Sequence, residues 1–285
     1  MTGANNRLQV SDRNHQLEGG CDPGYRDLRT MHILVTNDDG VFADGLLSLA
    51  RQMRQLGEVS ILAPDRNWSA SGHVKTLHRP LRVREVKLED GTPALASDGA
   101  PSDCVSLALL GLLPDPVDLV VSGINPNANL GYDVTYSGTV TAAMEAVIWG
   151  VPGVAVSLDA PEYHQGNLDY SSASRVVHQI VSRIAADDLP KDLLLNVNIP
   201  YLAYEEIQGV HITRLGLRVY REKLVRREDP RGVPYFWIGG DAPTGVAEQG
   251  TDIGALSRGM VSITPLHLDL TSYDKFEDLS ALRWD

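Results

Sequence analysis

The sequence predicts an α/β fold, a Rossmann-like and mostly parallel sheet flanked by helices. From residue 31 onward, short apolar runs alternate with amphipathic segments, a pattern typical of parallel strands joined by crossover helices. Polar loops rich in Gly, Asn and Asp follow several of the apolar runs. In open α/β sheets, ligands bind where strands end, so these loops are the candidate functional segments.

The first half of the pattern begins with the strand His32–Thr36. A helix at 43–56 follows, because Leu46, Leu49 and Met53 recur at helical spacing and Gly57 suits a helix end. The next strands are predicted at 59–63, 81–86 and 94–97, the last two on either side of a turn at 89–91.

The second half repeats the alternation. Pro101 suits the start of a helix at 102–112, and Gly150 ends another at 140–149. The remaining strands are predicted at 117–122, 151–158 and 193–199. A helix at 171–186 completes the repeating unit.

Beyond residue 200 the pattern changes. Strand-like runs at 210–220 and 235–238 flank a charged stretch at 221–231, which predicts a protruding β-hairpin with a long polar tip. We assign the region of about 205–245 to this hairpin and to oligomerisation. A short helix at 253–258 and a strand at 261–264 follow.

Length and charge limit the possible functions. With 285 residues, the chain has room for one large domain, assigned to 31–285, after a polar extension at 1–30 that we expect to be disordered. The formal net charge of −12 argues against nucleic-acid polymers and anionic membranes as partners. No apolar run is long enough to cross a membrane. Two cysteines, Cys21 and Cys104, are expected to be free thiols, which favours a cytoplasmic location.

The first candidate motif is Asn37-Asp38-Asp39-Gly40, directly after the first strand. Two adjacent carboxylates raise each other's pKa unless a cation compensates them. Mg²⁺ and Mn²⁺ prefer oxygen ligands of this kind. Asp-Gly is also common turn chemistry, so the motif alone leaves both a metal site and a plain turn open.

Two further polar loops follow strand ends. The first contains Ser69 and His73, whose side chains could bind a metal or carry a proton; a solvated surface loop is the alternative. The second runs from Asn125 through Asn129 to Ser137-Gly138-Thr139, where a helix begins. Helix N-termini bind anions, although Ser and Thr also cap helices without any ligand. If the sheet is parallel, all three loops meet, and we expect a metal and phosphate site.

The motifs resemble, in order along the chain, those of the SurE family, the stationary-phase survival nucleotidases. The matching segments are residues 31–40, 63–65, 69–73, 122–125, 136–140, 248–252 and 261–266. The resemblance covers essentially all of residues 31 to 275. An ordered set of this kind is far more specific than any single short motif.

The resemblance implies a metal-dependent nucleotidase that hydrolyses nucleoside 5′- and 3′-monophosphates, with short polyphosphate as a further substrate. It implies one divalent ion per subunit, Mg²⁺ or Mn²⁺, with four ligands: Asp38, Asp39, Ser69 and Asn125. It implies that the phosphate binds near five residues: Asn125, Asn129, Ser137, Gly138 and Thr139. It also implies a homodimer or homotetramer that exchanges the hairpin and a C-terminal segment.

Two departures from the family pattern stand out. Pro126-Asn127 replaces an Arg-Gly type of pair after Asn125, and Ala100 and Ser102 stand where Thr and Ala are common. Asn tolerates a positive φ better than most residues, so the turn after Asn125 can survive. Neither change alters a predicted ligand.

The mechanism we expect uses Asp38 and Asp39 to hold the ion, one of them also serving as base, with His73 as acid for the leaving oxygen or as a structural residue. The alternative enzyme is an aspartyl-phosphate phosphatase with a covalent intermediate; such enzymes space the carboxylates as Asp-x-Asp. A non-catalytic nucleotide-binding module is the third candidate, although no Gly-x-Gly-x-x-Gly follows the first strand.

Overall fold

The structure is a computed structural model that describes residues 31–161, 164–186 and 190–284. The predicted extension at 1–30, with Cys21, lies outside this part. A mixed sheet of nine strands in the order β3-β4-β2-β1-β5-β6-β7-β11-β8 forms the centre of the described chain. Neighbouring strands from β4 to β7 are parallel, whereas β3 and β11 each pair antiparallel with a neighbour. The predicted mostly parallel α/β sheet is therefore confirmed.

The strands of the parallel part lie close to the predicted positions. Their bounds are β1 His32–Thr36, β2 Glu58–Pro64, β3 Val83–Lys87, β4 Pro93–Ser97, β5 Leu119–Asn125, β6 Gly153–Asp159 and β7 Leu194–Pro200. Strands β1, β5, β6 and β7 are almost wholly buried. Both faces of the sheet are covered, which agrees with the mainly apolar sequences of these strands.

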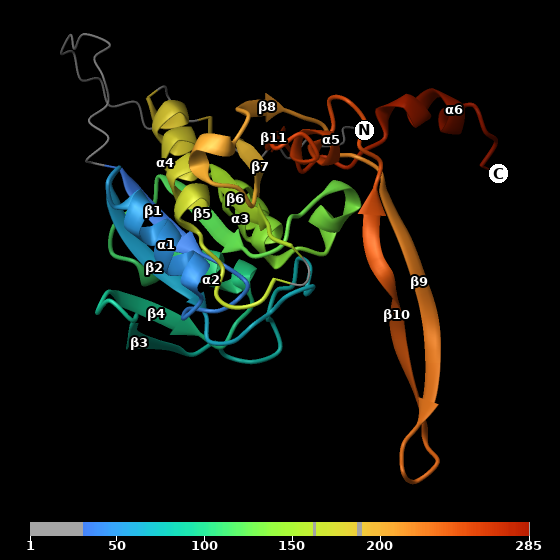
Figure 1. The fold of residues 1–285 in the computed structure, drawn as a ribbon, viewed down its shortest axis with the longest axis horizontal. Helices are drawn as coiled ribbons and strands as arrows, with labels where there is room; N and C mark the ends of the chain where they lie inside the picture. Colours follow the sequence, from blue (N-terminus) through green and yellow to red (C-terminus); the bar gives the residue numbers. More distant parts are fainter. Residues whose placement is uncertain (1–30, 162–163, 187–189, 285) are drawn as a thin grey trace, which may run out of the picture.

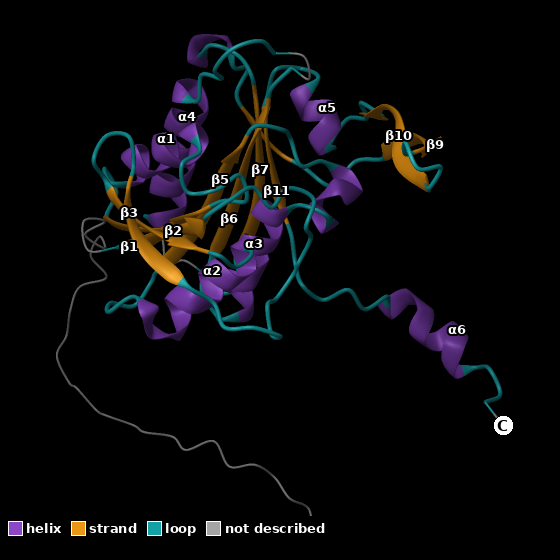
Figure 2. Cartoon of the chain, turned by 90° about the horizontal axis from the view of Figure 1, so that it is seen from below, coloured by secondary structure: helices purple, strands orange, loops and turns teal. Residues whose placement is uncertain are grey.

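Two pairs of helices cover the sheet. Helices α1 (Asp44–Met53) and α4 (Ser171–Ala185) lie on one face, and α2 (Pro101–Leu107) and α3 (Gly138–Ile148) lie on the other (Figure 2). Leu46, Leu49 and Met53 of α1 are fully buried in the core on their face. On the other face Cys104 is buried, and burial raises the pKa of its thiol well above the ordinary value.

The helix predicted at 102–112 is shorter than expected. Regular α-helix stops at Leu107, and Ala108–Leu112 form a π-type turn in which Gly111 adopts φ 108°. Only Gly adopts this backbone conformation readily. None of the helices in the described ranges is long and apolar enough to cross a membrane.

The strands of the hairpin differ from the predicted ones in their bounds and length. Strands β9 (Arg218–Glu228) and β10 (Pro234–Gly245) pair antiparallel, so the charged stretch forms strand and the tip is short. The hairpin projects from the body (Figure 1). The first part of the predicted strand, β8 (Val210–Ile212), instead pairs parallel with β11 (Val261–Pro265) in the main sheet. Local sequence could not separate these strands because the break between them depends on pairing with β11.

The other helical elements of the described chain are short. They are the 3-10 turns η3 (Gly131–Thr135), η4 (Tyr204–Glu206) and η5 (Tyr273–Lys275), helix α5 (Asp252–Leu256) and helix α6 (Phe276–Ser280). Helix α6 stands apart from the body in both views (Figures 1 and 2). Its Phe276 and Leu279 are exposed. The domain assignment of 31–285 and the exchange of the C-terminal segment stay predictions.

Candidate active site at the carboxyl edge of the sheet

Three loops leave the carboxyl ends of β1, β2 and β5: the β1–α1 loop (37–43), the β2–β3 loop (65–82) and the β5–α3 loop (126–137). Backbone hydrogen bonds join them. Trp68 N donates to Asp38 O at 2.7 Å, and Gly72 N donates to Tyr136 O at 2.9 Å. The structure therefore brings together the three loops singled out in the sequence.

Asp38 is buried against the first turn of α3. Its carboxylate accepts a hydrogen bond from Thr139 Oγ1. Burial raises the pKa of Asp38 above the ordinary value, while hydrogen bonds from Thr139 and the Gly138 backbone offset part of that effect. A Cβ on Gly138 would lie 2.7 Å from Asp38 Cβ. Only Gly at this position lets the helix end approach the carboxylate so closely.

The pKa of the neighbouring Asp39 is raised as well. Burial and, secondarily, the negative charge of Asp38 raise the pKa of Asp39 to about 7. Its Oδ2 is buried and accepts no hydrogen bond from the described residues. The preceding Asn37 closes the turn by bonding the Gly40 carbonyl at 3.0 Å and its N–H at 3.2 Å. An unpartnered buried carboxylate oxygen beside a second carboxylate is a suitable environment for a cation.

Ser69 and Asn125, the other two predicted ligands, lie on the neighbouring loops. Ser69 is exposed, and its N–H donates to Asn67 Oδ1 at 2.7 Å. Asn125 ends β5 and donates Nδ2 to the Asn127 carbonyl, so its ligating atom would be Oδ1. This bond closes the turn at Pro126-Asn127, and Ala70 is the one described non-Gly residue with a positive φ. The departure from the family pattern is thus accommodated without a positive φ at Asn127.

The remaining phosphate-site candidates have structural partners as well. Ser137 caps α3, its Oγ accepting a hydrogen bond from Val140 N at 3.1 Å. Asn129 is buried and donates Nδ2 to Ser157 Oγ at 2.7 Å, and its N–H donates to Asn198 Oδ1 at 2.8 Å. Asn129 therefore anchors the β5–α3 loop to strands β6 and β7.

His73 contacts Glu145 of α3, a residue that was not among the predicted site residues. Its Nε2 is 2.8 Å from Glu145 Oε2. Glu145 also accepts hydrogen bonds from Lys75, Ser106 and Trp149. Burial disfavours the Glu145 carboxylate, but these bonds outweigh it and hold the pKa of Glu145 below its ordinary value. The available signal was a single charged residue in an otherwise small and apolar helix.

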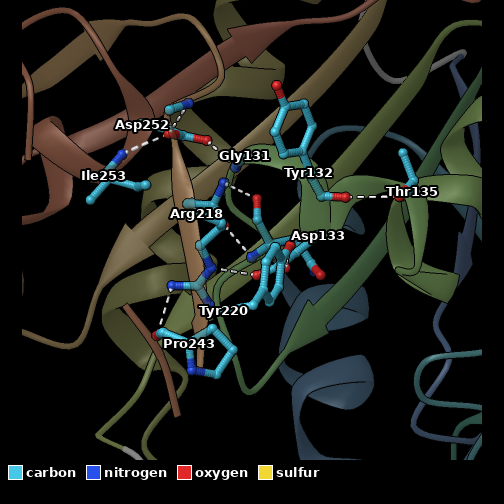
Figure 3. A network of polar contacts seen from close by, with 12 residues as sticks. Gly131, Tyr132, Asp133, Thr135, Arg218, Tyr220, Pro243, Asp252 and Ile253 are labelled. Carbon is cyan, nitrogen blue, oxygen red and sulfur yellow. Dashed lines mark hydrogen bonds and ion pairs between the residues drawn. The ribbon is translucent and has the colours of Figure 1, made fainter. Parts of the chain in front are cut away.

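A second polar network joins the β5–α3 loop to the base of the hairpin (Figure 3). Asp133 accepts bonds from Arg218 Nε and Tyr220 Oη, both at 2.6 Å. Burial and the bond to Asp133 raise the pKa of Tyr220 to about 12. Asp252 of α5 accepts from Gly131 N and Gly216 N, both at 2.8 Å. The loop that carries Asn129 is therefore held by segments more than 80 residues further along the chain.

The donor set at the site consists of oxygen atoms. No group of three or more His, Cys, Asp and Glu side chains gathers anywhere in the described ranges, so a Zn-type nitrogen and sulfur site is not found there. Two carboxylates, a hydroxyl and an amide oxygen suit a hard cation such as Mg²⁺ or Mn²⁺. The N-terminus of α3 adjoins Asp38, and helix N-termini are suited to binding anions. This combination is suited to phosphate ester chemistry.

Comparison with known proteins agrees with the geometry. Residues 33–222 match the family described as Survival protein SurE. The "5'-nucleotidase SurE" of Herpetosiphon aurantiacus is 52% identical over 255 residues, covering 90% of this chain and 99% of the relative. The protein of the same name from Chloroflexus aggregans is also 52% identical, with coverage of 90% and 100%. The crystal structure of the Sure protein from Aquifex aeolicus superposes with a TM-score of 0.74 at 41% identity, covering 87% of this chain and 98% of that one. The chain belongs to the SurE family.

Proposed function

We propose that the chain is a metal-dependent phosphomonoesterase that hydrolyses nucleoside 5′- and 3′-monophosphates to nucleoside and phosphate, with short polyphosphate as a further substrate. The observation that carries this proposal is the Asp38–Asp39 pair at the N-terminus of α3, with Asp39 Oδ2 buried and unpartnered among the described residues. The printed names of the relatives, 5′-nucleotidase, support the substrate class.

The residues present fit a divalent cation. Asp38, Asp39, Ser69 and Asn125 would hold one Mg²⁺ or Mn²⁺ per subunit, since all four supply oxygen donors. When bound, the ion supplies positive charge for the phosphate and lowers the pKa of a water molecule. Burial and the charge of Asp38 raise the pKa of Asp39 to about 7, and a bound cation would compensate this charge.

Other side chains and the N-terminus of α3 position the carboxylate, stabilise charge and supply a proton. Thr139 Oγ1 holds the Asp38 carboxylate in place. The helix N-terminus at Ser137–Thr139 stabilises negative charge on phosphate oxygens. His73 keeps Nε2 on Glu145, so its other nitrogen, Nδ1, is the one that could pass a proton to the leaving ribose oxygen. The pH dependence of kcat for His73→Gln separates the two roles of His73. A changed pH profile indicates the acid, and an unchanged profile indicates a structural residue.

The test of the reaction class is phosphate release from a panel of nucleoside monophosphates and p-nitrophenyl phosphate, with Mg²⁺, Mn²⁺ or EDTA. Asp39→Asn should lose turnover, because it removes a ligand while conserving shape. Asp90→Asn is the matched control: Asp90 pairs with Arg51 at 3.0 Å, in the turn between β3 and β4 at the opposite edge of the sheet. Full activity of Asp39→Asn, or of wild type in EDTA, would contradict the proposal.

Two alternatives give different results in the same experiment. An aspartyl-phosphate phosphatase would yield a trapped phosphoaspartate, although Asp38 and Asp39 are adjacent and not spaced as Asp-x-Asp. A non-catalytic nucleotide-binding module would bind nucleotide without metal-dependent turnover.

The same proposal includes a homodimer or homotetramer built through the hairpin and the C-terminal segment. Exposed apolar side chains support it: Leu224 is 70% and Ile238 77% exposed on the hairpin. Apolar surface of this extent on a projecting element favours contact with another chain. Light scattering after gel filtration tests it, and a monomer at micromolar concentration would contradict it.

A further inference from the structure

Glu145 is a buried carboxylate that takes no direct part in the mechanism above. Its side chain is only 3% exposed, and it lies on α3 six residues, or about 9 Å, beyond Thr139. Taking a carboxylate out of water is costly unless its lone pairs are satisfied. Four donors satisfy Glu145, and where they come from indicates its role.

Two of the donors belong to the scaffold and two to the β2–β3 loop. Ser106 Oγ of α2 lies 2.6 Å away, and Trp149 Nε1 lies 2.9 Å away. His73 Nε2 and Lys75 Nζ, each at 2.8 Å, come from a loop without regular secondary structure. Ser106 and the backbone before Trp149 are held by helix packing in any case, so the contacts of Glu145 matter most for the loop.

The other attachments of this loop segment lie on both sides of His73 and Lys75. Trp68 N bonds Asp38 O, and Gly72 bonds Tyr136 O through its N–H and Thr141 Oγ1, at 3.1 Å, through its carbonyl. Ser69 sits between Trp68 and Gly72. After Lys75, Thr76 N and Thr76 Oγ1 donate to the Asp103 carboxylate of α2 at 2.9 and 2.6 Å. Between these two sets of contacts, Glu145 holds His73 and Lys75 with charge-assisted hydrogen bonds, which are stronger than neutral ones.

We propose that Glu145 is a positioning residue: through His73 and Lys75 it holds the segment 68–75 against α3 and so keeps Ser69 in reach of the Asp38–Asp39 pair. The inference rests on the proposed function, because Ser69 is a metal ligand only there. Loss of such an outer partner typically weakens metal affinity or activity by about 10–100-fold.

The experiment compares Glu145→Gln, which keeps the shape and removes the charge, with Glu205→Gln as control. Glu205 is exposed and pairs with Arg175 at 3.5 Å. Three quantities are measured: the Mn²⁺ concentration that gives half the thermal shift, kcat at saturating Mn²⁺, and the rate of trypsin cleavage after Arg66 and Lys75 in EDTA. For Glu145→Gln we expect about tenfold weaker Mn²⁺ binding, faster cleavage in the segment, and kcat largely restored at saturating Mn²⁺.

A merely structural role predicts another result. If Glu145→Gln lowers the melting temperature but keeps wild-type Mn²⁺ affinity and wild-type cleavage, the inference is wrong. Should this variant fail to fold, Lys75→Met replaces it, since the Lys75 side chain is 42% exposed; weaker Mn²⁺ affinity supports the inference and unchanged affinity overturns it. Wild-type protein without a Mn²⁺ response would refute the proposed function instead, and cleavage in EDTA would still decide whether Glu145 holds the segment.

Discussion

The substitution Gly138→Ala adds one methyl group at the point where α3 meets Asp38. The new Cβ would lie 2.7 Å from Asp38 Cβ and 2.9 Å from Asp38 Oδ2. Non-bonded carbon atoms ordinarily approach to about 3.5–4.0 Å, so the carboxylate and the helix end must separate by about 1 Å. Displacement of this size at a reacting centre lowers turnover by about 100-fold.

Stability should fall far less than activity. Overpacking of one methyl group typically costs about 1–3 kcal/mol, or about 2–4 °C of melting temperature per kcal/mol for a domain of this size. The assay is kcat on a nucleoside monophosphate, beside the melting temperature. Gly239→Ala is the control, because the nearest atom to its Cβ, Val225 Cγ2, is at an ordinary 3.8 Å. A Gly138→Ala enzyme within threefold of wild-type kcat would refute the argument that close approach fixes Asp38.

Three further predictions concern the charged groups. Asp39→Asn should abolish the rise in melting temperature that Mn²⁺ causes in the wild type, where the ion stabilises the fold by about 2.7 kcal/mol at 100 times Kd. In EDTA at pH 8 the variant should melt at a higher temperature than wild type. A carboxyl group whose pKa is raised from 3.8 to about 7 on folding lowers stability once the pH exceeds 3.8. A retained rise with Mn²⁺ would exclude Asp39 as ligand. In Glu145→Gln the melting temperature should fall less steeply than in wild type as the pH is lowered. A carboxylate with a lowered pKa contributes stability above pH 4.5 that is lost as the pH falls. Equal dependence of melting temperature on pH in the two proteins would contradict this. Arg218→Met should speed amide hydrogen exchange in residues 131–136, because it removes the 2.6 Å contact to Asp133. Unchanged exchange would contradict this and would show that the contacts from Tyr220 and Asp252 suffice.

The contrast between β9 and β1 shows where prediction from sequence succeeds. The run His32–Thr36 is buried throughout and apolar at its three central positions, and it was correctly predicted as a strand. The charged stretch 221–231 was predicted as a polar tip, yet residues 221–228 belong to strand β9 because they pair with β10. Charged side chains are compatible with an exposed two-stranded ribbon, and local composition does not reveal such pairing.

Site residues divide in the same way. Asp38, Asp39 and the Ser137–Thr139 turn follow strand ends or open a helix, and parallel topology alone puts such positions at one edge. Glu145 sits in the middle of a helix, and its partners His73 and Lys75 are more than 69 residues away in sequence. A contact of that separation has no local signal.

The sequence by itself determined the alternation of strands and helices from residue 32 to 199, the edge of the sheet where the candidate site lies and the oxygen-rich character of the predicted ligands. These follow from periodicity and from which residue types end the strands. Only the tertiary structure decided that Gly138 must be small, that Asp39 Oδ2 lacks a partner among the described residues, and that Glu145 and Asp133 hold the site loops. These properties depend on distances between atoms from different segments, and such distances exist only once the chain has packed.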